Sequence, residues 1–252
     1  MFLCKDLVEY LDKLLQPEKC HDYAPNGLQV MGQAGISHIV TGVSANLALI
    51  EAAIEKGADT LLVHHGLFWE KGSPCVVGFK HARLKALLVN NLNLLAYHLP
   101  LDVHPVYGNN AQLAEIFGIK IIQLVKVGGI DNLLTLGMFP KPRTKDEISK
   151  EISKKLMREP FHVGPKDKPI QKIALCSGGA QGFLEDAIAH GVDAYITGEV
   201  SESCYAVAKE SNIHFFGCGH HATERYGIQA LGNHLAKQYK VQHTFIDIPN
   251  PI

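Results

Sequence analysis

The residues best suited to chemistry in this chain are its histidines, which number 14 among 252 residues. Several of them directly follow short apolar runs, and carboxylates accompany them at a spacing of four residues. The resulting set consists of His64, His65, His98, Asp102, His220 and Glu224. Neutral imidazole is the commonest protein ligand of transition metals, and imidazole with carboxylate suits Zn, Fe, Mn, Ni or Co. The pattern predicts a site for divalent metal ions.

The spacing within this set supports the metal interpretation. His220 and Glu224 are four residues apart at the predicted start of a helix, so one helical turn places both side chains on the same side. The adjacent His64 and His65 would point to opposite faces of a regular strand, but both can face one cavity where the chain leaves the strand. The solitary histidines are expected to be surface or hydrogen-bonded side chains instead. They are His21, His38, His81, His162, His190, His234 and His243.

The elements that must position these residues form an alternation of strands and helices. Apolar, β-branched runs at 36–43 and 59–63 enclose a stretch at 46–56 with helical spacing. A further helix at 81–90 leads to a third strand at 92–97. This order is typical of a parallel sheet with helices on its faces, in which ligands collect at the carboxyl ends of the strands.

The same order returns later in the chain, with strands at 170–176, 194–197 and 213–217. Asp193 lies 134 residues after Asp59, and the same offset relates other residues of the two stretches. We therefore expect an α/β protein of two similar, interlinked halves from an internal duplication, each a mostly parallel sheet flanked by helices. The halves are residues 1–126, with His64, His65 and Asp102, and residues 127–252, with His220 and Glu224.

Composition excludes several other classes of protein. The formal net charge of −1 argues against a nucleic-acid binder that works through bulk positive charge. A local basic rim would escape this test, and its residues would be Lys145, Lys150, Lys154, Lys155 and Arg158. The six scattered cysteines form no C-x-x-C pair and fit a reducing cytoplasm. No apolar run reaches the ~20 residues of a membrane helix. The Gly-rich stretch 177–182 lacks the Lys-Ser/Thr of a P-loop, which favours a tight turn over a phosphate site.

Five short motifs occur in order along the chain. They are Ala24-Pro25-Asn26-Gly27-Leu28-Gln29-Val30, Val63-His64-His65-Gly66, Tyr97-His98-Leu99-Pro100-Leu101-Asp102, Thr197-Gly198-Glu199 and Gly219-His220-His221-Ala222-Thr223-Glu224-Arg225. In these motifs and their separations the chain resembles the YbgI-type (NIF-three-like) family, whose members are often named GTP cyclohydrolase 1 type 2 homologues. The resemblance runs from about residue 20 to Pro251, nearly the whole chain.

The resemblance implies a dinuclear metal centre with two divalent ions per chain and a toroidal homohexamer of two-domain subunits. Matched residue by residue, the implied metal ligands are His64, His65, Asp102, His220 and Glu224. In the family pattern Glu224 bridges the two metals. His65 and Asp102 then complete one metal site, and His64 and His220 complete the other.

We expect a metal-dependent hydrolase that acts on a small molecule, with nucleotides as the first candidates. Two metals about 3.5–4 Å apart would share a water, lower its pKa and stabilise the developing oxyanion. His98 is our candidate for proton transfer. The alternative is a non-catalytic metal-binding adaptor used in metal handling, cofactor assembly or regulation, which would contain the same ligands. The donor set does not choose among Zn, Fe, Mn, Ni and Co.

Overall fold

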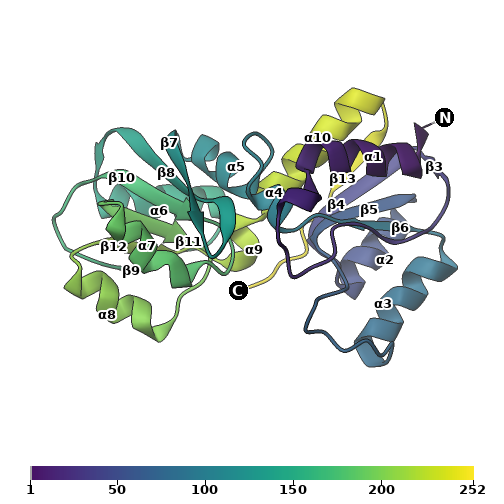
Figure 1. The fold of residues 1–252 in the computed structure, drawn as a ribbon, viewed down its shortest axis with the longest axis horizontal. Helices are drawn as coiled ribbons and strands as arrows, with labels where there is room; N and C mark the ends of the chain where they lie inside the picture. Colours follow the sequence, from purple (N-terminus) through teal and green to yellow (C-terminus); the bar gives the residue numbers. More distant parts are fainter. Residues whose placement is uncertain (1) are drawn as a thin grey trace. The chain divides into compact units, whose positions relative to one another are not determined.

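The computed structural model describes residues 2–252, which fold into two compact units, each built around one sheet (Figure 1). The first unit takes in the chain up to Tyr107 together with Gly227–Pro249, and the second takes in Gly108–Tyr226 and Asn250–Ile252. The compact units do not coincide with the sequence halves 1–126 and 127–252, because the last long helix and the last strand pack into the first unit.

The first unit is built on a five-stranded sheet in the order β13-β4-β5-β6-β2. These strands are β13 (Gln242–Phe245), β4 (His38–Ser44), β5 (Thr60–His65), β6 (Asn93–Ala96) and β2 (Gly27–Val30). All neighbours are parallel except β2, which runs antiparallel to β6 at the edge. A separate antiparallel pair joins β1 (Phe2–Leu3) to β3 (Gly35–Ile36).

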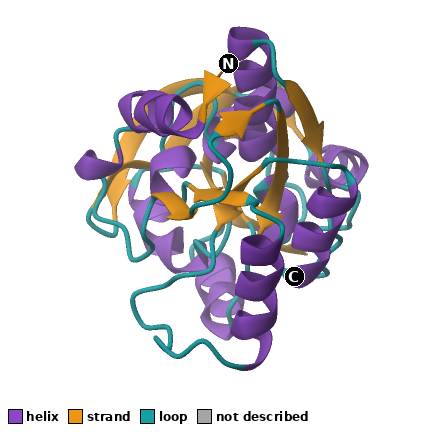
Figure 2. Cartoon of the chain, turned by 90° about the vertical axis from the view of Figure 1, so that its right-hand side faces the viewer, coloured by secondary structure: helices purple, strands orange, loops and turns teal. Residues whose placement is uncertain are grey.

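Helices bury both faces of this sheet. On one face, α1 (Cys4–Leu15) and α10 (Arg225–Tyr239) come from opposite ends of the chain and lie side by side, sharing a core that contains Leu11 and Leu231 (Figure 1). On the other face, α2 (Leu47–Glu55) and α3 (Gly78–Val89) pack apolar side chains against the strands of the sheet. Figure 2 shows helices flanking the strands. The chain also contains two short helices in this unit, η1 (Pro17–Lys19) and α4 (Leu99–Asp102).

The second unit is built on a six-stranded sheet in the order β7-β8-β10-β11-β12-β9. Its strands are β7 (Lys120–Val127), β8 (Ile130–Arg143), β10 (Ile170–Cys176), β11 (Ala194–Thr197), β12 (His214–Gly217) and β9 (Phe161–Val163). Only β10, β11 and β12 are mutually parallel.

Both sheets are therefore mixed, and the expectation of a mostly parallel sheet is wrong for the second unit. The reasons are a long antiparallel hairpin, β7–β8, which extends the parallel core at one edge, and the antiparallel strand β9 at the other edge. Gly128 and Gly129 form its turn at φ +59° and +83°, a left-handed conformation that glycine adopts without steric cost.

The second unit also contains helices, one of which begins at His220. They are α5 (Asn109–Ile116), α6 (Lys145–Leu156), η2 (Gln181–Phe183), α7 (Leu184–Ala189), α8 (Glu202–Glu210) and α9 (His220–Thr223). Helix α6 begins at a capping box, in which Thr144 accepts from the backbone N–H of Glu147 and the Glu147 carboxylate accepts from the backbone N–H of Thr144. Its apolar stripe, including Ile148 and Ile152, joins the main core of this unit.

Matching hydrogen bonds occur in the two units at the same offset of 134 residues. Asp59 Oδ2 accepts from the backbone N–H groups of Ser37 and His38, just where β4 begins. Asp193 Oδ2 accepts in the same way from Gln171 and Lys172 in β10. The two aspartates therefore fix equivalent strand ends. Within residues 2–252, no helix has the length and apolar character needed to cross a membrane.

Candidate metal centre

Three imidazoles converge at the carboxyl ends of two neighbouring strands of the first unit. His64 and His65 end β5, and His98 follows β6, which pairs in parallel with β5. The ring centroid of His64 lies 4.5 Å from that of His65 and 5.0 Å from that of His98, and His65 and His98 are 5.6 Å apart. One ring nitrogen from each lies within 4.8 Å of the others, which is close enough to hold a metal ion.

Each of these rings is oriented through its Nδ1 atom. His64 Nδ1 lies 3.1 Å from the carbonyl oxygen of Tyr97, and His98 Nδ1 lies 2.9 Å from Asp22 Oδ1. A carbonyl and a carboxylate only accept hydrogen bonds, so Nδ1 of each ring carries a hydrogen. His65 Nδ1 lies 2.9 Å from the hydroxyl of Ser44. This anchoring through the second ring nitrogen is the arrangement that metal-binding histidines almost always have.

Asp102 brings a carboxylate to the same cluster. It ends the short helix α4, whose first turn begins at His98, and its Oδ2 lies 3.6 Å from His64 Nε2. The Asp102 side chain is buried, so it sits among the imidazoles rather than in solvent. The spacing of four residues between His98 and Asp102 thus brings both to one cluster.

Asp22 is a site residue that the sequence interpretation missed. It lies in the loop before β2 and accepts from His98 and from the backbone N–H of Leu99. Burial alone would raise the pKa of Asp22, but hydrogen bonds from His98, Asn26 and Leu99 outweigh burial and hold the pKa below its ordinary value. Asp22 is therefore an ionised, buried carboxylate that faces His98.

The second unit holds its own imidazole–carboxylate cluster. His220 opens α9, and its Nε2 lies 3.2 Å from Glu224 Oε1, as the spacing of four residues predicts. Its Nδ1 lies 2.7 Å from Glu199 Oε1. Burial lowers the pKa of His220, but the hydrogen bonds and charges of Glu224 and Glu199 outweigh burial and raise it to about 9. Two carboxylates around one imidazole favour positive charge at this position, whether as a proton or as a metal ion.

The Gly-rich stretch supplies the space in which Glu224 lies. Gly178 has φ +66°, and a Cβ atom at this position would lie 2.2 Å from Glu224 Oε1 and 3.3 Å from His220 Nε2. Its backbone is fixed by hydrogen bonds: the N–H donates to Thr223 Oγ1 over 3.0 Å, and the carbonyl accepts from the N–H groups of Gly198 and Glu199. The Glu224 carboxylate can therefore occupy its position only because residue 178 has no side chain.

The structure sorts the predicted site residues into two groups by unit. It brings together His64, His65, His98 and Asp102 in the first unit, and His220 with Glu224 in the second. Glu199 was present in the Thr197-Gly198-Glu199 motif but was not recognised as a partner of His220, from which it is 21 residues distant. His104 accepts from the backbone N–H groups of Val106 and Tyr107, and thus stabilises a turn.

Several solitary histidines are hydrogen-bonded, as expected. His38 contacts Thr244, His243 contacts Thr41, and His162 contacts His214 over 3.0 Å.

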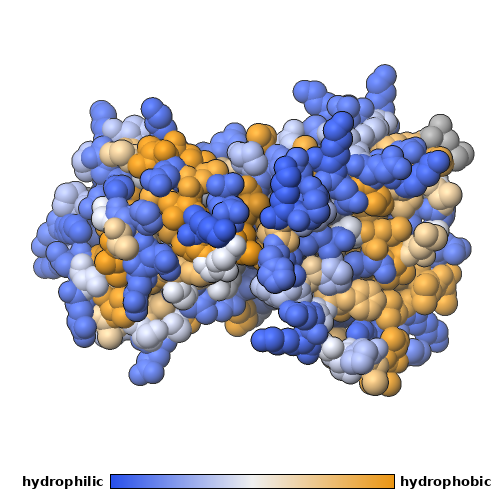
Figure 3. Space-filling view, in the orientation of Figure 1, coloured by the Kyte–Doolittle hydropathy of each residue, from blue (hydrophilic) through white to orange (hydrophobic). Residues whose placement is uncertain are grey.

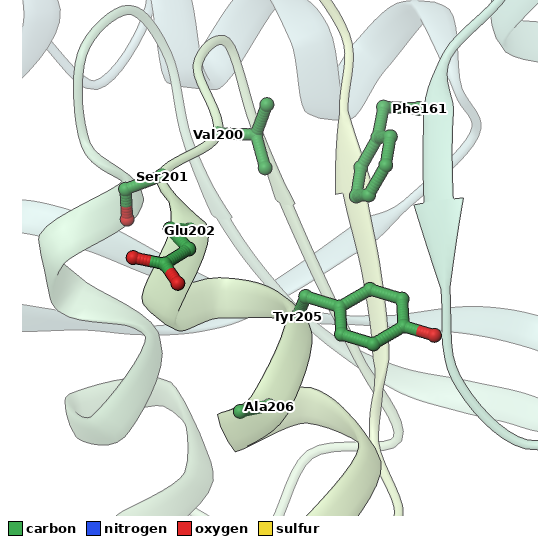
Figure 4. A pocket seen from close by; sticks show the side chains of 6 residues that line it. All are labelled: Phe161, Val200, Ser201, Glu202, Tyr205 and Ala206. Carbon is green, nitrogen blue, oxygen red and sulfur yellow. The ribbon is translucent and has the colours of Figure 1, made fainter.

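A separate hollow in the second unit lies between β9 and α8 (Figure 4). Its lining consists of Phe161, Val200, Ser201, Glu202, Tyr205 and Ala206. The lining has one carboxylate and no imidazole, so it offers neither a paired acid and base nor a metal-ligand set. The chemistry-bearing residues are those of the two clusters.

The sequence matches the family model described as Duf34/NIF3 (NGG1p interacting factor 3) over residues 2–251. The chain belongs to this family. Curated relatives include a protein of Pseudomonas aeruginosa, 50% identical over 97% of both chains, and one of Haemophilus influenzae, 48% identical over 98% of both. Both are named GTP cyclohydrolase 1 type 2 homolog. The resemblance inferred from the five motifs is confirmed.

Solved structures show the same fold. A protein described as ybgI, of unknown function, is 44% identical and superimposes with a TM-score of 0.95 over the full length of both chains. TTHA1606 from Thermus thermophilus is 31% identical, with a TM-score of 0.88 over the full length of both.

Proposed function

We propose that this chain is a dinuclear metal-dependent hydrolase of a small, nucleotide-like molecule. The observation that carries the proposal is the set of imidazoles that end neighbouring strands, each held through Nδ1 and accompanied by buried carboxylates. The proposed ligands of the two ions are His64, His65, Asp102, His220 and Glu224. Following the family pattern, Glu224 would serve both ions, His65 and Asp102 one, and His64 and His220 the other.

The residues present fit such a centre. The donors are imidazoles and carboxylates without cysteine, which suits divalent Zn, Fe, Mn, Ni or Co. Gly178 leaves the position of the Glu224 carboxylate open, and the pKa of His220, raised to about 9, marks a position that favours a cation. Two divalent ions in such a centre supply Lewis-acid stabilisation and a more acidic water.

The chain's own residues would do the remaining work. His98 would hold or release a proton at Nε2, because Asp22 keeps the hydrogen on Nδ1 and balances the charge of the imidazolium. The rings of Tyr23 and Trp69 pack edge-on against His98, at 5.0 and 5.3 Å between centroids, and limit access of water to it. Glu199 would keep His220 in one orientation. Relatives named for GTP cyclohydrolase make guanine nucleotides the first substrates to test.

The decisive experiment combines metal content with turnover. Protein purified without chelator or added metal should contain two divalent ions per chain by elemental analysis, and His65→Ala and Glu224→Gln should each lower that content. His81→Ala is the matched control, because His81 is an exposed imidazole of the same unit as His65. The metal-loaded wild type should hydrolyse at least one member of a panel of nucleotides and phosphoesters. A wild type that turns over nothing beyond the His65→Ala background removes the hydrolase proposal.

A metal-binding adaptor is the second candidate function. The observation that favours it is an exposed apolar surface on the edge strand β7, where Ile121 is 37% and Ile122 48% exposed (Figure 3). Large exposed apolar groups of this kind occur at protein contacts. Metal that exchanges readily, no turnover and one reproducible protein partner would together select the adaptor.

We also propose that the chain works in the cytoplasm as a toroidal homohexamer, by analogy with the family pattern. The apolar surface of β7 supports self-assembly as well as an external partner. Sedimentation of a species of six 27.6 kDa chains is the expected result, and a monomer at all concentrations would contradict it. The near-neutral net charge supports a small-molecule ligand over nucleic acid.

We infer, finally, that the two units descend from one ancestral α/β unit by duplication. The matching hydrogen bonds of Asp59 and Asp193, 134 residues apart, support this origin.

A further inference from the structure

His98 is held by two side chains of a loop far away in the sequence. Its Nδ1 lies 2.9 Å from Asp22 Oδ1, and its backbone N–H donates to Asn26 Oδ1 over 2.7 Å. Asn26 Nδ2 in turn donates to Asp22 Oδ2 over 3.0 Å. Asp22 and Asn26, which are hydrogen-bonded to each other, therefore hold both the ring and the backbone of His98.

The Asp22 carboxylate is saturated with donors. Oδ1 accepts from His98 Nδ1 and from the backbone N–H of Ala24 at 3.1 Å, and Oδ2 accepts from Asn26 and from the backbone N–H of Leu99 at 2.9 Å. The Asp22 side chain is only 3% exposed, and that of His98 is 7% exposed. A buried carboxylate with four donors has no reason to rotate, so the position of the acceptor that faces His98 is fixed.

We propose that Asp22 and Asn26 are positioning residues that lock His98 in the tautomer with hydrogen on Nδ1, so that Nε2 is its proton-accepting atom. The proposal rests on the proposed function for its purpose, since it assigns the proton-transfer atom of the same site. Which nitrogen of an imidazole carries the hydrogen is set by the hydrogen bond that the other makes. The tautomer itself is a property of the protein that can be measured with or without turnover.

The variant Asp22→Asn tests this tautomer directly. The new amide has one oxygen and one NH2 group, and one of them must face His98 and the backbone N–H of Ala24. If the oxygen faced them, the NH2 group would oppose the two donors from Leu99 and Asn26. If the NH2 group faced His98, it would clash with only one donor, the N–H of Ala24. In that orientation His98 Nδ1 must accept a hydrogen bond instead of donating one. The variant should therefore move the hydrogen of His98 from Nδ1 to Nε2.

The measurement is two-dimensional ¹H–¹⁵N NMR of the imidazoles in uniformly ¹⁵N-labelled protein. The His98 signals are assigned by their loss in His98→Gln. Wild type should show Nδ1 protonated and Nε2 unprotonated, and Asp22→Asn should show the reverse. Asp12→Asn is the matched control, because Asp12 is a hydrogen-bonded carboxylate of the same unit that contacts Tyr97 over 2.7 Å and has no hydrogen bond to His98. This control should leave the tautomer of His98 unchanged.

The outcomes separate this proposal from the proposed function. A wild-type His98 whose single hydrogen lies on Nε2 overturns the positioning role, and this result does not depend on the folding of Asp22→Asn. An unchanged tautomer in a folded Asp22→Asn overturns it as well. Where a substrate has been found, Asp22→Asn should lower kcat about 10–100-fold while the chain keeps its metal content. Absence of metal or of turnover in wild type removes the proposed function but leaves the tautomer result standing.

Discussion

Replacing Gly178 by alanine tests the geometry of the second-unit cluster with a single methyl group. Gly178 has φ +66°, and a Cβ there would lie 2.2 Å from Glu224 Oε1. Real Cβ atoms keep at least about 3 Å from an oxygen, so the carboxylate would have to move by about 1 Å. Because Glu224 is buried, such a movement displaces it from His220 rather than into water.

The expected destabilisation has two parts. Alanine in the left-handed region costs about 1–2 kcal/mol, offset by about 0.4–1 kcal/mol because the unfolded chain loses freedom. Displacing Glu224 from His220, which it contacts over 3.2 Å, adds the loss of a hydrogen bond between charged groups, about 1.5–3 kcal/mol. We therefore expect a total of about 2–4 kcal/mol, of which roughly 2 kcal/mol arises from the displacement.

Gly191 provides a matched control for the backbone part. It has φ +63°, and a Cβ there would meet nothing within 4 Å, so Gly191→Ala carries the left-handed cost alone. Urea unfolding of both variants should differ by roughly 2 kcal/mol. Elemental analysis should show that Gly178→Ala loses at least one of the proposed metal ions while Gly191→Ala loses none. Equal stability and equal metal content in the two variants would refute the argument that Gly178 exists to make room for Glu224.

Three neighbouring groups lead to further predictions. Glu199→Gln should weaken metal binding about 10–100-fold, because it removes a charged anchor of His220. Glu202→Gln, at an exposed carboxylate, should leave metal binding unchanged. Titration calorimetry measures the metal affinity of both variants. Metal affinity should rise with pH up to about 9, because the ion displaces a proton from His220, whose pKa is raised to about 9. Calorimetry in buffers of different ionisation enthalpy reveals the released proton. Absence of proton release would contradict this assignment. Burial, together with His214, lowers the pKa of His162 from 6.5 to about 4, so the folded state excludes a proton that the unfolded state binds. The contribution of His162 to the free energy of unfolding should therefore be fully present above pH 6.5 and fall between pH 6.5 and 4 by about 1 kcal/mol, after allowance for solvent screening. His162→Gln should flatten this fall in urea titrations.

The first-unit cluster can be predicted from the sequence, because the order of the strands is enough to place its histidines together. His64 and His65 end β5, His98 follows β6, and these two strands are consecutive along the sheet, parallel and adjacent. Parallel neighbours bring their carboxyl ends to one edge whatever the detailed register, so no further information is needed. The spacing of four residues between His220 and Glu224 is likewise local, and the structure confirms their contact.

The anchors could not be predicted in the same way, because their positions depend on long-range packing. Asp22 lies 76 residues before His98, in a loop without hydrophobic periodicity. Glu199 reaches His220 only because β11 and β12 are adjacent and the chain turns closely at Gly198, where the backbone N–H bonds to Gly178. The β7–β8 hairpin is different, since the Gly128-Gly129 pair was a visible turn signal that the strand–helix alternation obscured.

The anchoring of the imidazoles implies that the fold, rather than a bound ion, sets their orientation. Ser44 is carried by β4, Tyr97 offers its backbone carbonyl, and Asp22 and Glu199 come from two loops, so each ring is held by a different part of the chain. The imidazole rings lose their rotational freedom when the chain folds. Metal binding therefore carries no further entropy cost for ordering them. Loss of one anchor should therefore weaken metal binding more than it weakens the fold, since the ring keeps its packing but regains rotation. A variant such as Glu199→Gln that lowered stability and metal affinity in equal measure would show instead that the anchors serve the fold alone.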